Sequence, residues 1–107
     1  YSPDLVQIYD DNISPKLFQL SNAYPNPFNP NTVINYSVIK KGFVSIDIFD
    51  LNGLLVKNII QKDHFAGDHS IIWDGKNESG IKVASGNYFY TLKANNFLET
   101  KKVILLK

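Results

Sequence analysis

Alternation of apolar and polar residues in three short segments is the feature that most constrains the fold of this chain. It is clearest in Thr32–Ile39, Phe43–Asp50 and Asn87–Ala94. Because the side chains of a β-strand point alternately to two faces, each segment predicts a strand with one buried face. Turn-forming residues separate the segments, most clearly the Asp-Leu-Asn-Gly at 50–53, since Asn-Gly tolerates the positive φ of tight hairpins. No segment shows a useful helical period, so the pattern predicts an all-β sandwich of about seven strands.

The alternation also predicts which residues form the core and where the strands lie. The predicted core faces contain Ile34, Tyr36, Val38, Val44, Ile46, Ile48, Tyr88, Tyr90 and Leu92. The predicted strands are about Leu17–Ser21, Thr32–Ile39, Phe43–Asp50, Leu54–Ile60, His69–Trp73, Asn87–Ala94 and Leu98–Leu106. A polar loop is predicted over Gln61–Asp68, and Ile81–Ala84 is a candidate for a short edge segment.

The 107 residues have the length of one domain. Residues 1–16 predict a linker, because Pro, Asp and Asn break every periodic pattern there, and residues 17–107 predict the domain. The chain begins at Tyr1 and contains no methionine. We therefore expect it to be the C-terminal part of a longer protein, with the linker joining the domain to an upstream passenger.

Composition excludes several classes of function. A net charge of +1 gives no electrostatic reason to expect nucleic-acid or membrane-surface binding. The absence of cysteine excludes a disulfide framework, a thiolate zinc site and a cysteine nucleophile. No segment approaches the roughly 20 apolar residues of a membrane-spanning helix. No cofactor is expected.

The aromatic residues predict a core more strongly than a binding surface. Trp73 alternates with Ile71, and a lone Trp in a sandwich usually packs against the opposite sheet. The alternative is a platform on which a sugar stacks. Phe49 and Phe89 fall on the outer faces of their strands, which makes them candidates for a surface patch.

The polar residues do not predict a metal site or an active site. Asp74, Asn77 and Glu78 lie in one turn, but calcium needs about six to eight oxygen ligands, and Asx-type hydrogen bonds explain the same residues. His64 and His69 have no third nitrogen ligand to complete a site. No nucleophile elbow or acid–base pair is recognisable, so the chain is not predicted to be an enzyme.

Two further segments are candidates for recognition. The Tyr-Pro-Asn-Pro-Phe-Asn-Pro at 24–30 predicts a rigid corner, with Tyr24 and Phe28 capping the core, or alternatively a peptide-recognition motif. Val103–Leu106 is apolar throughout, so the last strand must bury both faces or offer one to a partner. The residues alone leave both readings of this strand open. Either way, we expect its end to be able to leave the sandwich without unfolding it.

Together with the Trp-Asp-Gly at 73–75 and the Gly-Asn-Tyr-Phe-Tyr at 86–90, these segments resemble the C-terminal sorting domain of the type IX secretion system, type A, of the Bacteroidetes. Related Ig-like modules, including that of the flagellar hook-capping protein, carry the Trp-Asp-Gly and Gly-x-Tyr-x-Tyr elements. The resemblance covers about Leu20–Lys107 and implies an Ig-like antiparallel β-sandwich. Domains of this family direct an upstream passenger across the outer membrane and catalyse nothing.

The resemblance implies roles for three groups of residues. The segment that the translocon recognises would be Lys101, Lys102, Val103, Ile104, Leu105, Leu106 and Lys107. The motif that opens the domain would be Pro25, Asn26, Pro27, Phe28, Asn29 and Pro30. The scaffold positions would be Asp50, Gly53, Trp73, Asp74, Gly75, Gly86, Tyr88 and Tyr90.

The resemblance also implies partners and a location. The partners would be the outer-membrane type IX translocon, a β-barrel shuttle protein that captures the terminal segment, and a sortase-like protease that commonly removes the domain. The domain would be a monomer that crosses the periplasm and reaches the cell surface or the medium. Two other classes stay open: a carbohydrate-binding or adhesion module, and a structural Ig-like module of a larger secreted protein.

Overall fold

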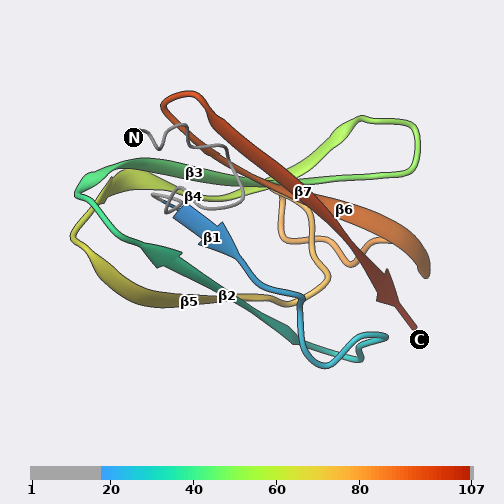
Figure 1. Ribbon diagram of the computed structural model, residues 1–107. Helices are drawn as coiled ribbons and strands as arrows, with labels where there is room; N and C mark the ends of the chain where they lie inside the picture. The colour runs from blue at the N-terminus through green and yellow to red at the C-terminus, as the bar shows by residue number, and fades with distance from the viewer. Residues whose placement is uncertain (1–17, 107) are drawn as a thin grey trace, which may run out of the picture.

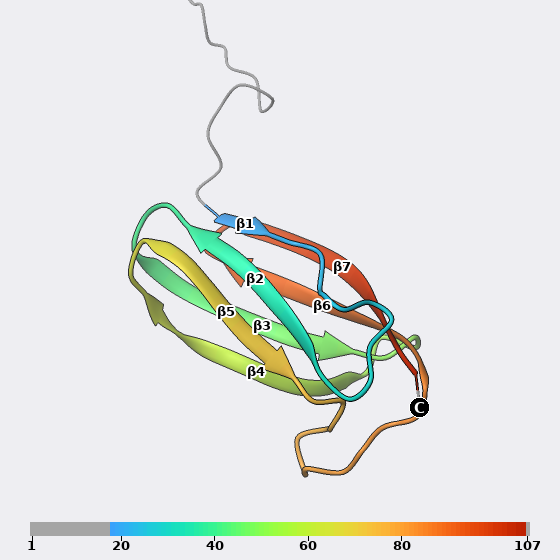
Figure 2. The same ribbon diagram turned by 90° about the horizontal axis from the view of Figure 1, so that it is seen from below.

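Two antiparallel β-sheets packed face to face form the domain (Figures 1 and 2). The computed structural model describes residues 18–106, so the predicted linker and Lys107 lie outside the described residues. One sheet has the strand order β1-β2-β5 and the other β4-β3-β6-β7. The strands are β1 (Phe18–Leu20), β2 (Thr32–Val38), β3 (Gly42–Phe49), β4 (Leu55–His64), β5 (Gly67–Trp73), β6 (Gly86–Ala94) and β7 (Phe97–Leu105). The predicted all-β sandwich is confirmed, and over the described range no helix is long and apolar enough to cross a membrane.

Most predicted strands begin and end within a residue or two of those observed, but the predicted polar loop at Gln61–Asp68 is wrong. β4 continues to His64, which pairs with Gly42, and β5 already begins at Gly67. β4 is an edge strand, so Gln61, Lys62 and Asp63 remain exposed and no apolar alternation marks its second half; only its last residue, His64, is buried. Ile81–Ala84 forms no strand; its one ladder contact is an isolated bridge between Lys76 and Lys82.

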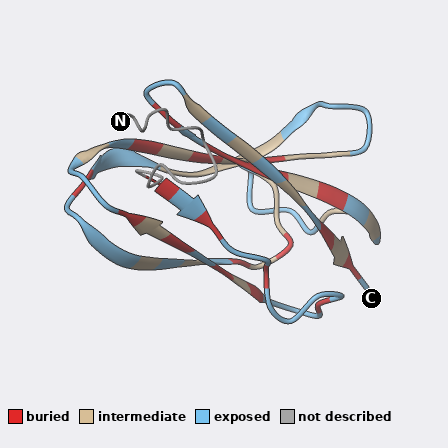
Figure 3. Cartoon of the chain, in the orientation of Figure 1, coloured by how far each residue is buried: buried red, intermediate tan, exposed pale blue. Residues whose placement is uncertain are grey.

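The core lies between the two sheets, and every residue that the alternation assigned to it is buried. Figure 3 shows buried positions alternating with half-buried or exposed ones along β2 and β3, and along β6 except at the buried Thr91. Removing such a side chain from water stabilises the fold by about 1.5–3 kcal/mol, so these strands supply much of the driving force for folding. The residues buried outside those strands include Phe18, Leu20, Phe28, Trp73, Val103 and Leu105.

Phe49 and Phe89 lie on the outer face of the four-stranded sheet. They are directly opposite each other in the ladder between β3 and β6, and both are half-buried. The next strand along, β7, places Lys102 beside Phe89. Both rings are therefore partly covered, and they form a smaller exposed surface than their positions in the sequence suggest.

Tyr36 and His64 close the end of the core at which β3 begins. The Tyr36 hydroxyl and His64 Nε2 are 2.6 Å apart, and both side chains are buried. His64 Nδ1 lies 2.9 Å from the Lys62 carbonyl oxygen, which can only accept, so Nδ1 carries a proton. In neutral His64, Nε2 then accepts from Tyr36. A buried polar pair satisfied in this way costs little, and it gives His64 a structural role.

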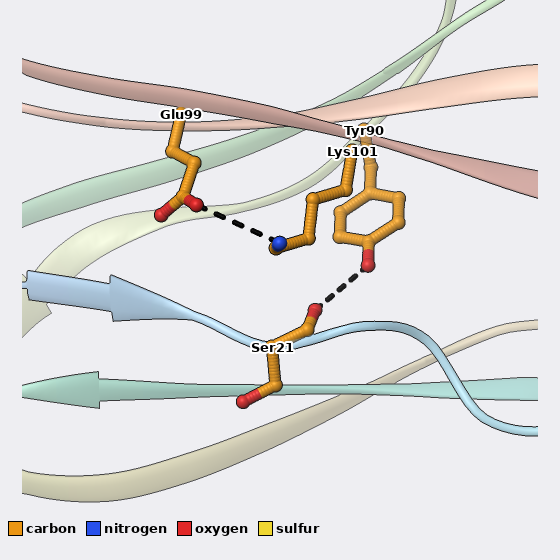
Figure 4. A network of polar contacts seen from close by, with 4 residues as sticks. All are labelled: Ser21, Tyr90, Glu99 and Lys101. Carbon is orange, nitrogen blue, oxygen red and sulfur yellow. Dashed lines mark hydrogen bonds and ion pairs between the residues drawn. The ribbon is translucent and has the colours of Figure 1, made fainter.

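The buried tyrosines of β6 also have hydrogen-bond partners. The Tyr88 hydroxyl donates to the Ala84 carbonyl, four residues upstream, as in the tyrosine corner of Ig-like sandwiches. The Tyr90 hydroxyl reaches across to the Ser21 carbonyl after β1, at 2.7 Å (Figure 4). Burial raises the pKa of Tyr36 and of Tyr88, the latter helped by the Asp50 carboxylate. Burial raises the pKa of Tyr90 most, from 10.0 to about 12.

These shifts predict a loss of stability in base. A raised pKa means that the folded state keeps the phenolic proton at a pH where the unfolded chain has lost it. The stabilisation is therefore complete below about pH 10 and is lost as the pH rises towards 12. The free energy of unfolding in urea, measured across this pH interval, should show the decline. Tyr90→Phe should make the decline shallower because it removes the phenol with the raised pKa. The titration of lysines is common to both proteins and cancels in the comparison. If the free energy of unfolding of Tyr90→Phe falls with pH in parallel with that of the unsubstituted domain, the loss of stability does not come from Tyr90.

Candidate recognition site at the terminal strand

The terminal strand β7 is held differently on its two faces. On its inner face Val103 and Leu105 are buried in the core, paired in the ladder with Tyr88 and Gly86 of β6. Ile104 is half-buried and Leu106 is exposed. The sequence predicted that this strand buries both faces or offers one to a partner; in the structure one face is core, and the rest of the segment remains near the surface.

The Pro-rich loop lies along the outer edge of β7, where no strand of the sheet pairs (Figures 1 and 2). Phe28 forms a parallel bridge to Leu105: its N–H donates to the Ile104 carbonyl at 2.9 Å, and its carbonyl accepts from Leu106 N–H at 3.0 Å. The Asn26 side chain continues this pairing. Its Oδ1 accepts from Ile104 N–H at 2.9 Å, and its Nδ2 donates to the Lys102 carbonyl at 3.3 Å. Four hydrogen bonds thus join the two segments that the sequence singled out separately.

The Phe28 side chain anchors this loop in the core. It is 1% exposed, and its ring centroid lies 5.3 Å from that of Trp73. Gly75 lies beside this contact, and a Cβ there would meet the Leu105 methyls at 3.5 Å and Phe28 at 3.8 Å, which are ordinary van der Waals distances. The reason for glycine is its φ of +73°, which disfavours other residues. Phe28 therefore caps the core as predicted.

The same expectation for Tyr24 is wrong, since this side chain is 77% exposed. The Tyr24 N–H and carbonyl both pair with Val33 at the start of β2, which fixes the backbone and directs the side chain outwards. Thr32 Oγ1 donates to the Pro25 carbonyl at 2.8 Å and ties down the next residue of the loop. The loop is thus fastened to β2 at one end and to β7 at the other.

Six of the eight scaffold residues fall into two groups; of the other two, Tyr90 bonds to Ser21 and Asp74 lies in the turn after β5. Trp73, Gly75, Gly86 and Tyr88 surround the end of β7 and the ring of Phe28. Asp50 and Gly53 instead form the hairpin turn between β3 and β4, where Asp50 Oδ1 accepts from the N–H groups of Asn52 and Leu54. Gly53 has the positive φ, 83°, that the Asn-Gly signal predicted.

The acidic turn after β5 is occupied by hydrogen bonds of its own. Asp74 accepts from Lys76 N–H, and Asn77 accepts from the N–H groups of Ser79 and Ile81, as expected for Asx turns. Glu78 differs, because its carboxylate caps the backbone of β4 at Asn58 rather than its own turn. Within residues 18–106 no group of three or more His, Cys, Asp or Glu is arranged to hold a metal ion.

The basic residues of β7 are not equivalent. Lys101 is half-buried on the inner side of the strand, and its Nζ lies 3.7 Å from the Glu99 carboxylate (Figure 4). Lys102 is exposed. A pocket of about 290 Å³ lies beside the end of the strand, lined by Leu105, Leu106, Asn29, Pro30 and Val83 among others. The accessible groups at this end of the domain thus include Lys102, Leu106 and the rim of this pocket.

The sequence profile of FlgD Ig-like domains matches residues 39–97, more than half of the chain. This chain belongs to the FlgD Ig-like domain family. The matched region ends before the segment 101–107 and begins after the motif 25–30. The two segments that contact each other at the end of β7 therefore lie outside the matched region. No curated protein sequence matches the chain.

Solved structures share the fold of this domain. Dimeric latent PorU from Porphyromonas gingivalis is 22% identical with a TM-score of 0.70, over 91% of this chain and 10% of that chain. PorZ of the same organism, an essential surface component of its type IX secretion system, is 21% identical with a TM-score of 0.56, over 80% of this chain and 11% of that chain. The FlgD Ig-like domain therefore corresponds to about a tenth of each, and the likeness shows the fold alone.

FlgD from Xanthomonas campestris, which acts in the hook capping essential for flagellar assembly, has the same fold. It is 25% identical to this chain with a TM-score of 0.57, over 82% of this chain and 64% of that chain. The chain thus spans less than two thirds of FlgD as well. All three proteins are longer and contain one region that this Ig-like domain resembles.

Proposed function

We propose that this domain is a C-terminal sorting domain that directs an upstream passenger across the outer membrane through the type IX secretion system. One observation carries the proposal: the motif 25–30 and the terminal segment, both outside the FlgD-like match, are joined by hydrogen bonds at one end of the sandwich. The order of motifs along the chain supports it. So does the shared fold with PorZ, a component of that system.

The architecture suits a segment that a partner can take up. β7 is the edge strand of its sheet, so its end can detach without breaking a pair between two other strands. Lys102 and Leu106 are accessible before any movement. A translocon or a β-barrel shuttle protein would read this end and then carry the domain outwards from the periplasm. In this account the domain catalyses nothing, and a sortase-like protease would cut upstream of it.

A fusion experiment tests the proposal. We expect the chain, placed after a periplasmic reporter, to carry that reporter to the surface or the medium of a host with the type IX system. A host without a working translocon is the control, and it should retain the reporter in the periplasm. If the reporter remains periplasmic in the intact host, the proposal is wrong.

A structural Ig-like module is the second candidate, and the FlgD family match favours it. Such a module would join or space other domains and would not require an accessible terminal strand. A bulky tag placed after Lys107 separates the two, because it should block sorting and leave a structural role intact. The sugar-binding alternative loses its main candidates, since Trp73, Tyr36, Tyr88 and Tyr90 are all buried. Phe49 and Phe89 are half-buried and Tyr24 is exposed, so an aromatic platform would have to use these rings.

A further inference from the structure

We propose that residues 26–28 form a latch that closes the outer edge of β7, and that a partner gains the terminal segment only after this latch opens. The inference rests on the proposed function for its biological meaning, although the latch itself can be tested without it. The backbone groups that the latch covers are the Lys102 and Ile104 carbonyls and the Ile104 and Leu106 N–H groups. These are the groups with which an extended strand of a partner protein would pair.

The two halves of the β7 edge are protected by different means against pairing with a strand of another chain. In the first half Glu99 and Lys101 lie half-buried on the inner side, and inward-pointing charges discourage strand addition. In the second half the inner residues are Val103 and Leu105, which carry no charge. An uncovered edge there would be flat, apolar and ready to pair with another chain. The latch covers only this second half.

The latch is built to open without unfolding the domain. Asn26 is exposed and uses its side chain, rather than its backbone, to imitate a pairing strand. Exposed hydrogen bonds of this kind contribute little net stability, so breaking them requires little free energy. The Phe28 ring differs, because its burial against Trp73 keeps the loop attached to the core when the hydrogen bonds to β7 break. The Asn26 side chain and the Phe28 backbone are thus the releasable parts of the latch, and the Phe28 ring is its anchor.

Amide hydrogen exchange tests whether the latch moves as a unit. The informative probe is Leu106 N–H, which donates to Phe28 and not to Asn26. In Asn26→Ala we expect Leu106 exchange to accelerate about tenfold, since each lost hydrogen bond is worth a factor of about 2–10 in the opening equilibrium. Asn26→Asp keeps the acceptor for Ile104 but loses the donor to Lys102, so its effect should be intermediate.

Two controls make the exchange experiment decisive. Asn22→Ala changes an exposed asparagine of the same loop that has no hydrogen bond to the described part of β7, and it should leave Leu106 exchange unchanged. Val103 and Leu105 alternate with the outward-donating residues and face β6, so their amides should remain slow in all variants. Acceleration at Ile104 alone in Asn26→Ala would overturn the latch, because the loop would then not respond as one unit.

A cross-link tests whether opening is needed for export. Asn29 and Leu106 are exposed and line the same pocket, and the chain has no cysteine to compete. In the oxidising periplasm Asn29→Cys with Leu106→Cys should form a disulfide that holds the latch closed. We expect the cross-linked fusion to stay in the periplasm, and the same double-cysteine fusion to be exported faster when its disulfide is kept reduced. Both forms carry the same substitutions, so a direct effect of Leu106→Cys on recognition cancels in the comparison. Export of the cross-linked form at the rate of the reduced form would overturn the gating role. A periplasmic unsubstituted fusion would instead overturn the proposed function and leave the exchange result standing.

Discussion

Replacing Trp73 with alanine is expected to destabilise the domain by about 3–5 kcal/mol, the range for removing a large buried aromatic side chain. The indole is fully buried between the rings of Phe28 and Tyr88, whose centroids lie 5.3 and 5.2 Å away. Its Nε1 also donates to the Lys76 carbonyl at 2.9 Å, which orders the turn after β5. The free energy of unfolding in urea measures the effect.

The control for this variant is Phe65→Ala, which removes an aromatic ring that is 75% exposed at the turn between β4 and β5. It should change the stability by no more than about 0.5 kcal/mol, as is usual for surface positions. A loss below about 1 kcal/mol for Trp73→Ala would mean that the ring is not packed in solution. That result would restore the sugar-platform alternative.

Deleting residues 103–107 is expected to cost about 3–6 kcal/mol, because Val103 and Leu105 each lose a burial worth about 1.5–3 kcal/mol. The pairing of β7 with Gly86–Tyr88 is lost as well. Since small domains have only about 5–15 kcal/mol of stability, the truncated domain should be marginal or unfolded. Thermal unfolding of the truncated and full-length chains measures this. A truncated domain as stable as the full chain would contradict the placement of Val103 and Leu105 in the core.

The expected loss of stability on deletion changes how the terminal segment can be studied. From its sequence the end of the strand was expected to leave the sandwich without unfolding it, and burial of Val103 and Leu105 makes that departure expensive. A partner that takes the segment must therefore compensate for the lost core contacts. A deletion removes core and recognition surface together, so substitutions at exposed positions are the better probe of function.

Local pattern was enough to predict the body of the fold. The alternation around Tyr36, Ile46 and Tyr90 identified the buried faces, because in a two-layer sandwich one side of each strand must be apolar. The Asn-Gly turn at 52–53 was predicted by its backbone preference alone. The second half of β4 was missed, because a polar edge strand carries no such signal.

The arrangement at the candidate site could not be predicted in the same way. Asn26 and its partners Lys102 and Ile104 are 76 and 78 positions apart, and nothing in either segment encodes the pairing. The sequence singled out both segments, yet only the register of β6 with β7 and the position of Phe28 bring them together. The pair of Tyr36 and His64 was missed for the same reason, since it depends on the long hairpin that extends β4.

The most direct measurement of the central claim is the exported fraction of a reporter fused to two matched double variants. One carries Lys102→Glu and Leu106→Ser at the exposed end of the β7 region; the other carries Lys62→Glu and Leu55→Ser on β4, the opposite edge of the same sheet. All four side chains are exposed, so both variants should unfold at nearly the same temperature as the unsubstituted domain. The sorting account predicts that the first fusion stays in the periplasm and the second is exported normally. Equal export of the two fusions would contradict it.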